Sequence, residues 1–128
     1  MIVLDTHTWL WWVSVDAKLS RAAEKAIRAT KTIGICAISC LEIAMAVEKG
    51  RVLLDRDPLE WMQQALALDR VELLALSPAI AVKATQLGRG FHGDPADRLI
   101  VATTILEAAT LVTKDERIRD YPAVTTIW

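Results

Sequence analysis

The chain has 128 residues, of which 53% are hydrophobic and 24% are charged, and its formal net charge at pH 7 is −1. This length suits one domain with a proper core. The near-neutral charge excludes a global basic field of the kind that many nucleic-acid-binding proteins carry, so any contact with phosphates must come from local patches. The mean hydropathy of +0.30 predicts apolar surface that a partner or a second copy covers.

Strand and helix patterns alternate along the chain. In chain order we predict strand 1–4, helices 8–13 and 20–30, strand 33–37, helices 39–49 and 58–68, strand 71–76, helices 78–87 and 95–109, and strands 111–113 and 124–127. This alternation is typical of a parallel sheet with helices on both faces. We therefore predict an α/β fold: a single domain over residues 1–128, built as a three-layer α/β/α sandwich with a central, mainly parallel sheet of four to five strands.

The apolar segments of the chain do not indicate a membrane protein. The segment MIVLDTH reaches Asp5 without a basic n-region, so we do not expect it to be a signal peptide. The longest apolar run, residues 99–112, is too short to span a bilayer and contains Glu107. We expect a cytoplasmic protein that makes no contact with a membrane.

The two cysteines, Cys36 and Cys40, are expected to be buried free thiols in a reducing cytosol. The alternative is a zinc site that they form together with His7 and His92. The spacing of these four residues matches no recognised zinc motif, which favours the first interpretation.

Four acidic residues fall at the ends of the predicted elements. Asp5 and Asp115 directly follow strands, whereas Glu42 and Asp97 lie in the first turns of helices. In an open parallel α/β sheet these ends share one edge, where ligand crevices form. Placing Asp97 at that edge also requires the strand order, which the sequence leaves open.

Each acid also has a purely structural interpretation. In HGDPADR, Asp94 suits a helix N-cap and Asp97 the first helical turn. The residues from Ser39 to Glu42 match a capping box, with Ser39 as the N-cap. Asp5 can cap the helix that begins near residue 8, and Asp115 can begin the turn KDERIRD. Four caps, however, have no reason to converge on one edge.

A cluster of four carboxylates requires a cation or bound protons. Two carboxylates about 5 Å apart repel each other by roughly 3 kcal/mol at an effective dielectric constant near 20. Carboxylate oxygens suit Mg²⁺ or Mn²⁺ better than Zn²⁺. A hard divalent ion keeps waters that can attack a phosphoryl group, and it takes up negative charge on a phosphoryl oxygen.

The chain resembles the PIN-domain family and, within it, the VapC-like ribonuclease toxins of type II toxin–antitoxin systems. The resemblance covers essentially all residues and rests on four blocks in order: MIVLDTHTWLWW, AISCLEIAMAVEKGRV, HGDPADRLIVATTI and LVTKDERI. It implies an endoribonuclease that requires Mg²⁺, with Mn²⁺ as the alternative ion, acts on RNA, pairs with a small antitoxin and forms a homodimer. The metal-binding and catalytic residues would be Asp5, Glu42, Asp97 and Asp115, and no other cofactor is implied.

Three neighbouring polar residues, Thr6, Ser39 and Asp94, are expected to support these acids. Thr6 and Ser39 adjoin metal-site acids and can donate hydrogen bonds to ligands or to metal-bound water. Asp94 is expected to cap the helix of the third block beside the site. Arg98 has three interpretations: it orients Asp94, contacts phosphate or lies on the surface.

Basic and aromatic residues outside the acids leave alternatives open. One predicted helix carries a row of cations, continued by one lysine: Arg21, Lys25, Arg28 and Lys31. A solvated face is favoured, and a track for an RNA backbone is the alternative. Trp9 and Trp12 are one turn apart and flank Trp11. We expect one side of this helix to join the core and the remaining ring to serve a dimer or antitoxin groove, with base stacking as a further alternative.

Two other functions compete with the nuclease. A phosphatase of the haloacid dehalogenase type needs a second Asp two positions after the first, where this chain has His7. A catalytically inactive PIN-like protein-interaction module is the stronger alternative. The presence of all four acids disfavours it, and Mg²⁺-dependent cleavage of RNA would separate the two.

Overall fold

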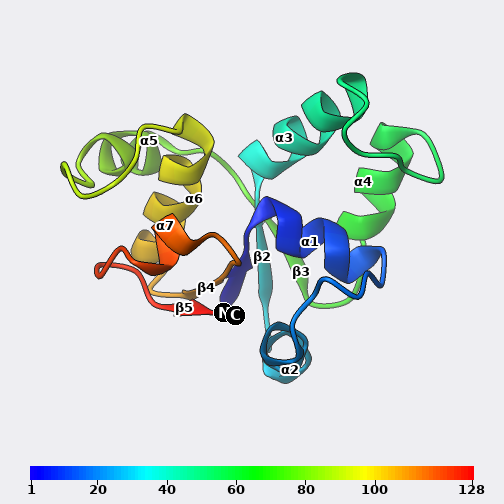
Figure 1. Cartoon of the computed structure of the whole chain (residues 1–128), viewed down its shortest axis with the longest axis horizontal. Coiled ribbons are helices and arrows are strands. Elements are labelled where there is room, and N and C mark those ends of the chain that lie inside the picture. Colours follow the sequence, from blue (N-terminus) through cyan, green and yellow to red (C-terminus); the bar gives the residue numbers. More distant parts are fainter.

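The computed structural model describes residues 1–128 as a layered α/β fold. Its elements are β1 (Ile2–Leu4), α1 (Thr6–Val13), α2 (Arg21–Ala29), β2 (Ile33–Cys36), α3 (Ala37–Glu48), α4 (Pro58–Leu66), β3 (Val71–Leu74), α5 (Pro78–Thr85), α6 (Pro95–Leu106), β4 (Thr110–Val112), α7 (Glu116–Arg119) and β5 (Thr126–Ile127). Figure 1 shows the sheet in the middle of the molecule, with α5, α6 and α7 on one side and α1, α3 and α4 on the other. The predicted three-layer sandwich is confirmed.

All five strands are parallel and follow the order β3-β2-β1-β4-β5. Leu4 at the end of the central strand pairs with Ile35 on one side and with Val112 on the other. The chain adds β2 and β3 on one side of β1 and then returns to add β4 and β5 on the other side. Ligand crevices in open parallel sheets form where the order reverses in this way, beside the carboxyl ends of β1 and β4.

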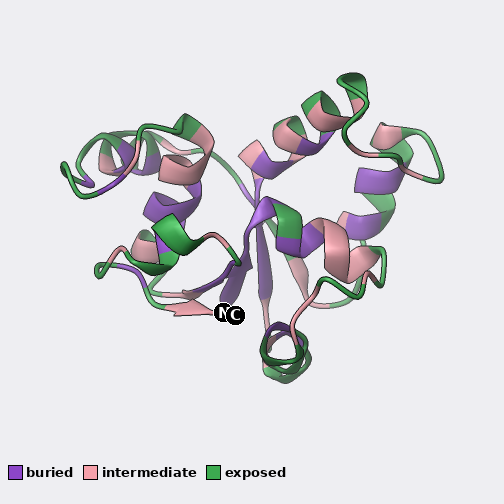
Figure 2. Cartoon of the chain, in the orientation of Figure 1, coloured by how far each residue is buried: buried purple, intermediate pink, exposed green.

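The alternation of side chains along the strands creates two separate cores. Ile2 and Leu4 of β1 belong to the core beneath α1, α2 and α4, which also contains Trp9. Val3 points to the opposite face and belongs to the core beneath α6 and α7, with Ile100 and others. Figure 2 shows that the inner strands β1 and β2 are buried, whereas the edge strand β5 is half-buried, and that the helices expose the sides that face away from the sheet. The sheet is thus held rigidly between two apolar layers.

Every predicted strand and helix is present, and the differences lie at their ends and in one short helix that was not predicted. Helix α1 begins at Thr6, two residues earlier than predicted, because Asp5 caps it. The segment KDERIRD, predicted as a turn, contains the short helix α7, which Asp115 caps. None of the helices combines the length and the apolar character needed to cross a membrane.

The predicted capping box at Ser39 and Glu42 is wrong. Helix α3 begins at Ala37, its N-cap is Cys36, and no side chain caps it. Ser39 therefore lies inside the first turn, where it is fully buried, and Glu42 lies in the second turn. Both side chains are engaged by another helix instead, as described below.

Candidate metal centre

Asp5 lies at the carboxyl end of the central strand with both carboxylate oxygens held. Oδ1 accepts the backbone N–H of Thr6 at 2.8 Å, and Oδ2 accepts the hydroxyl of Thr113 at 2.6 Å. The side chain is buried. Burial raises the pKa of Asp5, against the opposing effect of the hydrogen bonds from Thr113 and Thr6. This carboxylate is therefore fixed in position before any ligand arrives.

Thr113 connects Asp5 to Asp115. Its hydroxyl donates to Asp5, and the same oxygen accepts the backbone N–H of Asp115 at 3.1 Å. Thr113 is completely buried at the end of β4. One hydroxyl thus positions two acids from opposite ends of the chain. Sequence reasoning did not select Thr113; the available signal was its place at a strand end, two residues before an acid.

Glu42 is held by α1 rather than by its own helix. The Oγ1 atom of Thr6 lies 2.5 Å from Oε1 of Glu42 and 2.9 Å from Oγ of Ser39. A carboxylate only accepts, so Thr6 donates its single proton to Glu42 and accepts from Ser39. Burial raises the pKa of Glu42; Thr6 opposes this shift, and the charges of Asp5 and Asp97 add to it. The predicted support from Thr6 is direct, whereas Ser39 acts through Thr6.

Asp97 lies in the first turn of α6 and contacts a histidine. The Nε2 atom of His92 is 2.6 Å from its Oδ2. Burial raises the pKa of Asp97; His92 opposes this shift, and Asp5 and Asp94 add to it. Asp94 is the N-cap of α6, as predicted, and its Oδ1 accepts the backbone N–H groups of Ala96 and Asp97. Sequence reasoning had placed His92 only in the zinc alternative.

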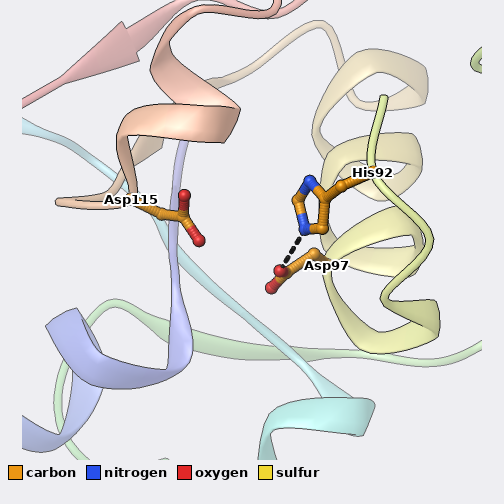
Figure 3. Close-up of side chains that lie close together, drawn as sticks. All are labelled: His92, Asp97 and Asp115. Carbon is orange, nitrogen blue, oxygen red and sulfur yellow. Dashed lines mark hydrogen bonds and ion pairs between the residues drawn. The ribbon is translucent and has the colours of Figure 1, made fainter. Parts of the chain in front are cut away.

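The four acids lie together at one edge of the sheet. Ligand atoms of His92, Asp97 and Asp115 all lie within 4.8 Å of one another. Figure 3 shows Asp115 facing His92 and Asp97 across the site from the segment that follows β4. Thr113 connects Asp115 to Asp5, and Thr6 connects Asp5 to Glu42 through its backbone N–H and its hydroxyl.

The charge of this cluster is poorly compensated by the protein. Asp5 and Glu42 form no ion pair, and Arg117 is no closer than 3.8 Å to Asp115. Such an arrangement fits a hard divalent cation, because carboxylate oxygens dominate the donor set. The zinc alternative does not fit, because the group of possible ligands that includes His92 consists otherwise of Asp97 and Asp115 and contains no cysteine.

Comparison with known proteins agrees with this geometry. The family model described as PIN domain matches residues 2–124. The chain belongs to the PIN-domain family. This PIN domain is 39% identical over 129 residues to Ribonuclease VapC22 of Mycobacterium tuberculosis, an alignment that covers 99% of this chain and 98% of the relative.

Solved structures share the fold of this PIN domain. The crystal structure of VapBC2 from Rickettsia felis, bound to a DNA fragment from their promoter, contains a chain with a TM-score of 0.72 and 21% identity. The alignment covers 98% of this chain and 97% of that one. A toxin–antitoxin complex from Klebsiella pneumoniae gives a TM-score of 0.68 and 21% identity, with the same coverage. At these identities the likeness shows the fold alone, and the predicted PIN-like architecture is confirmed.

Arg98 of this PIN domain neither orients Asp94 nor lies free on the surface. Its guanidinium donates to the carbonyl oxygens of Ala84 and Phe91, both at 3.2 Å, and lies over the Phe91 ring. The Phe91 ring in turn stacks on His92 at 4.4 Å between centroids. Arg98 thus fastens the loop that carries His92 to α5 and α6.

The tryptophans divide as predicted between core and surface. Trp9 is fully buried and its ring lies 5.2 Å from that of Trp61. Trp12 packs against the same core, and the half-buried Trp11 lines a cavity beside the site. The basic face of α2 is exposed, and Arg28 pairs with Glu24 on it. Helix α2 precedes β2 and α3 follows it, so α2 lies near the amino end of that strand. The acids lie at the carboxyl ends of the strands, at the other end of the sheet (Figure 1).

Proposed function

We propose that this PIN domain is a Mg²⁺-dependent endoribonuclease and the toxin of a type II toxin–antitoxin pair. The observation that carries the proposal is the convergence of four carboxylates at the point where the strand order reverses. The relative that is 39% identical is named a ribonuclease, which supports RNA as the substrate. A toxin–antitoxin complex among the structural neighbours supports a small antitoxin as the partner.

Asp5, Glu42, Asp97 and Asp115 would hold the Mg²⁺ ion, with Mn²⁺ as the alternative. A divalent ion bound there supplies an activated water as nucleophile and neutralises charge on a phosphoryl oxygen. Three carboxylate oxygens accept no hydrogen bond within the protein: Oε2 of Glu42, Oδ1 of Asp97 and Oδ2 of Asp115. These are the atoms that remain free to coordinate.

The polar neighbours keep these carboxylates in place. Thr6, supported by Ser39, holds one oxygen of Glu42, and His92 holds one oxygen of Asp97. Each contact leaves the other oxygen free. Such outer contacts typically contribute 10- to 100-fold to metal affinity or activity, roughly 1–3 kcal/mol. We assign Thr6, Ser39 and Asp94 to this supporting role rather than to the chemistry itself.

RNA cleavage by the purified protein tests the proposal. We expect cleavage of a labelled RNA with Mg²⁺ or Mn²⁺, no cleavage in EDTA, and no cleavage by Asp97→Asn. The matched control is Asp57→Asn, because Asp57 is an exposed cap of α4 and asparagine caps a helix equally well. Cleavage that survives EDTA would refute the metal mechanism. A well-folded wild type that cuts no RNA with either ion would favour the interaction module.

The proposal also includes that residues 1–128 form one functional domain, and that the protein is a cytoplasmic homodimer. Large apolar side chains that remain exposed on the chain support a partner or a second copy; they include Leu41, Leu53, Leu73, Leu76, Val82 and Leu106. Light scattering of the pure protein tests the dimer. A monodisperse monomer at high concentration would contradict it.

A further inference from the structure

A groove leads away from the acidic site between α1 and α3. It encloses a cavity of about 760 Å³, and its wall includes Thr6 and Glu42 of the site. Each of the two helices turns one face toward it, since residues three and four apart share a helix face. The lining side chains on these faces include Leu10, Trp11 and Ser14 of α1, with Met45, Ala46 and Lys49 at the end of α3.

The part of the groove farthest from the acids is basic. Lys18 follows the end of α1, Lys49 ends α3, and Arg51 follows it; all three line the cavity and are exposed. None of them forms an ion pair with a carboxylate. Asp16 also lines this part, and its carboxylate accepts the backbone N–H of Lys18 at 2.9 Å. The groove therefore has acids at one end and unpaired cations at the other.

Trp11 lines the groove and contacts two lysines. The ammonium of Lys18 lies 5.8 Å from the centre of its ring, and that of Lys114 lies 5.7 Å away. Lys114 stands between Thr113 and Asp115, so it extends from the acidic site itself. Contacts of this kind orient an ammonium group without neutralising its charge. Trp11 thus orients one lysine that lines the groove and a second lysine beside the acidic site, and neither lysine forms an ion pair.

We propose that this groove binds the RNA strand on one side of the bond that is cleaved. In this proposal, which rests on the ribonuclease function proposed above, Lys18, Lys49, Arg51 and Lys114 bind backbone phosphates. Glu42 and Lys49 are seven residues apart on α3, or about 10.5 Å along the helix axis. The basic end therefore meets RNA within a few nucleotides of the cleaved bond.

Charge complementarity selects a nucleic acid strand as the occupant. Four carboxylates repel a polyanion, and the chain as a whole has a net charge of only −1. At physiological salt a charge acts over roughly 8 Å, so a phosphate is attracted only by cations that lie close to it. A strand that runs from the acidic site along the groove meets such cations, whereas the cations of α2 lie toward the other end of the sheet.

Binding can be measured apart from cleavage in the Asp97→Asn background. Affinity for a fluorescent single-stranded RNA is measured by anisotropy at several salt concentrations in Mg²⁺. In this background, Lys18→Ala with Lys49→Ala should weaken binding at least about tenfold at low salt and reduce the slope of log K against log salt by about 1.4, or about 0.7 for each lost phosphate contact. Lys18→Arg with Lys49→Arg should retain both values. Arg21→Ala with Lys25→Ala removes the same charge from α2 and is the matched control.

In the active protein, Lys18→Ala with Lys49→Ala should raise KM about as much as it weakens binding and leave kcat unchanged. If Lys18→Ala with Lys49→Ala changes neither the salt slope nor KM, the groove proposal is overturned. The apolar lining of the groove would then indicate a protein segment as its occupant. An equal loss in the α2 variant would also overturn the groove proposal. Failure of the wild type to cut RNA at all would refute the proposed function instead, so the two failures are distinguishable.

Discussion

Replacing Asp97 with asparagine removes one charge from the acidic site and keeps the shape of the side chain. An amide still forms a hydrogen bond with His92, so the loop that carries the histidine is not released. In the metal-free protein, the negative charge of Asp97 destabilises the folded state, because burial and the neighbouring acids raise the pKa of this carboxyl group. We therefore expect Asp97→Asn to stabilise the metal-free protein while it abolishes cleavage.

The distances in the site set the size of this effect. Ligand atoms of Asp97 and Asp115 lie within 4.8 Å, which corresponds to a repulsion of about 3.5 kcal/mol at an effective dielectric constant near 20. Asparagine forfeits at most about 1 kcal/mol of interaction with the amino end of α6. The side chains remain 13% and 27% exposed, so solvent reduces the repulsion, and this pair alone contributes no more than about 2.5 kcal/mol.

Thermal melts in EDTA and in Mg²⁺ measure the effect. For a chain of this length, 1 kcal/mol shifts Tm by about 3–5 °C, so Asp97→Asn should melt up to about 10 °C higher than the wild type in EDTA. Mg²⁺ at 100 times its Kd should stabilise the wild type by about 2.7 kcal/mol and leave the variant nearly unchanged. Asp57→Asn should match the wild type under both conditions. A lower Tm for Asp97→Asn in EDTA would refute the electrostatic reasoning.

The remaining predictions concern the other groups of the site. Glu42→Gln keeps the side-chain shape and should reduce cleavage more than 100-fold without loss of Tm; normal cleavage would exclude a metal role for Glu42. Thr113→Val should weaken Mg²⁺ binding by about 10- to 100-fold in calorimetry, whereas Thr113→Ser should not. Asp94→Ala should lower the free energy of unfolding by about 1 kcal/mol with or without Mg²⁺, and Asp94→Asn should retain it. In EDTA, stability should fall as the pH rises above about 4, because the raised pKa values of Asp5, Glu42 and Asp97 make the folded state bind more protons than the unfolded state. Chemical denaturation across the acid range measures this, and constant stability there would contradict the shifts.

The elements of the fold could be predicted because each one is specified locally. The short apolar run from Met1 to Leu4 is followed directly by a helix cap. Asp94, the N-cap, and Pro95, the first helical residue, together mark the start of α6. The strand order could not be derived in the same way. Parallel strands are joined by helical crossovers, so the order depends on packing between distant segments. For this reason the sequence placed Asp5 and Asp115 at strand ends but left the position of Asp97 open.

The errors and omissions at the site have the same cause. Ser39 and Glu42 satisfy the local pattern of a capping box, yet Thr6 from another helix engages both side chains. Thr113 was missed because it acts on Asp5, an acid from the other end of the chain. His92 lies only five residues before Asp97, but it belongs to an irregular loop, where no periodic pattern indicates the direction of a side chain. Local rules find caps and periodic faces, whereas the contacts of Thr6 and Thr113 exist only after the sheet has assembled.

The order in which the chain is made therefore bears on when the site can exist. The central strand β1 emerges first during synthesis, but its neighbour β4 begins only at Thr110. Until that segment is available, Asp5 lacks its bond from Thr113, and the acidic site lacks Asp115. Pairing between segments so far apart is also slow to form. A nascent chain that already carries Asp5, Glu42 and Asp97 is thus still without a complete site, and the proposed nuclease becomes competent to cut RNA only after residues 110–115 have been synthesised and have joined the sheet.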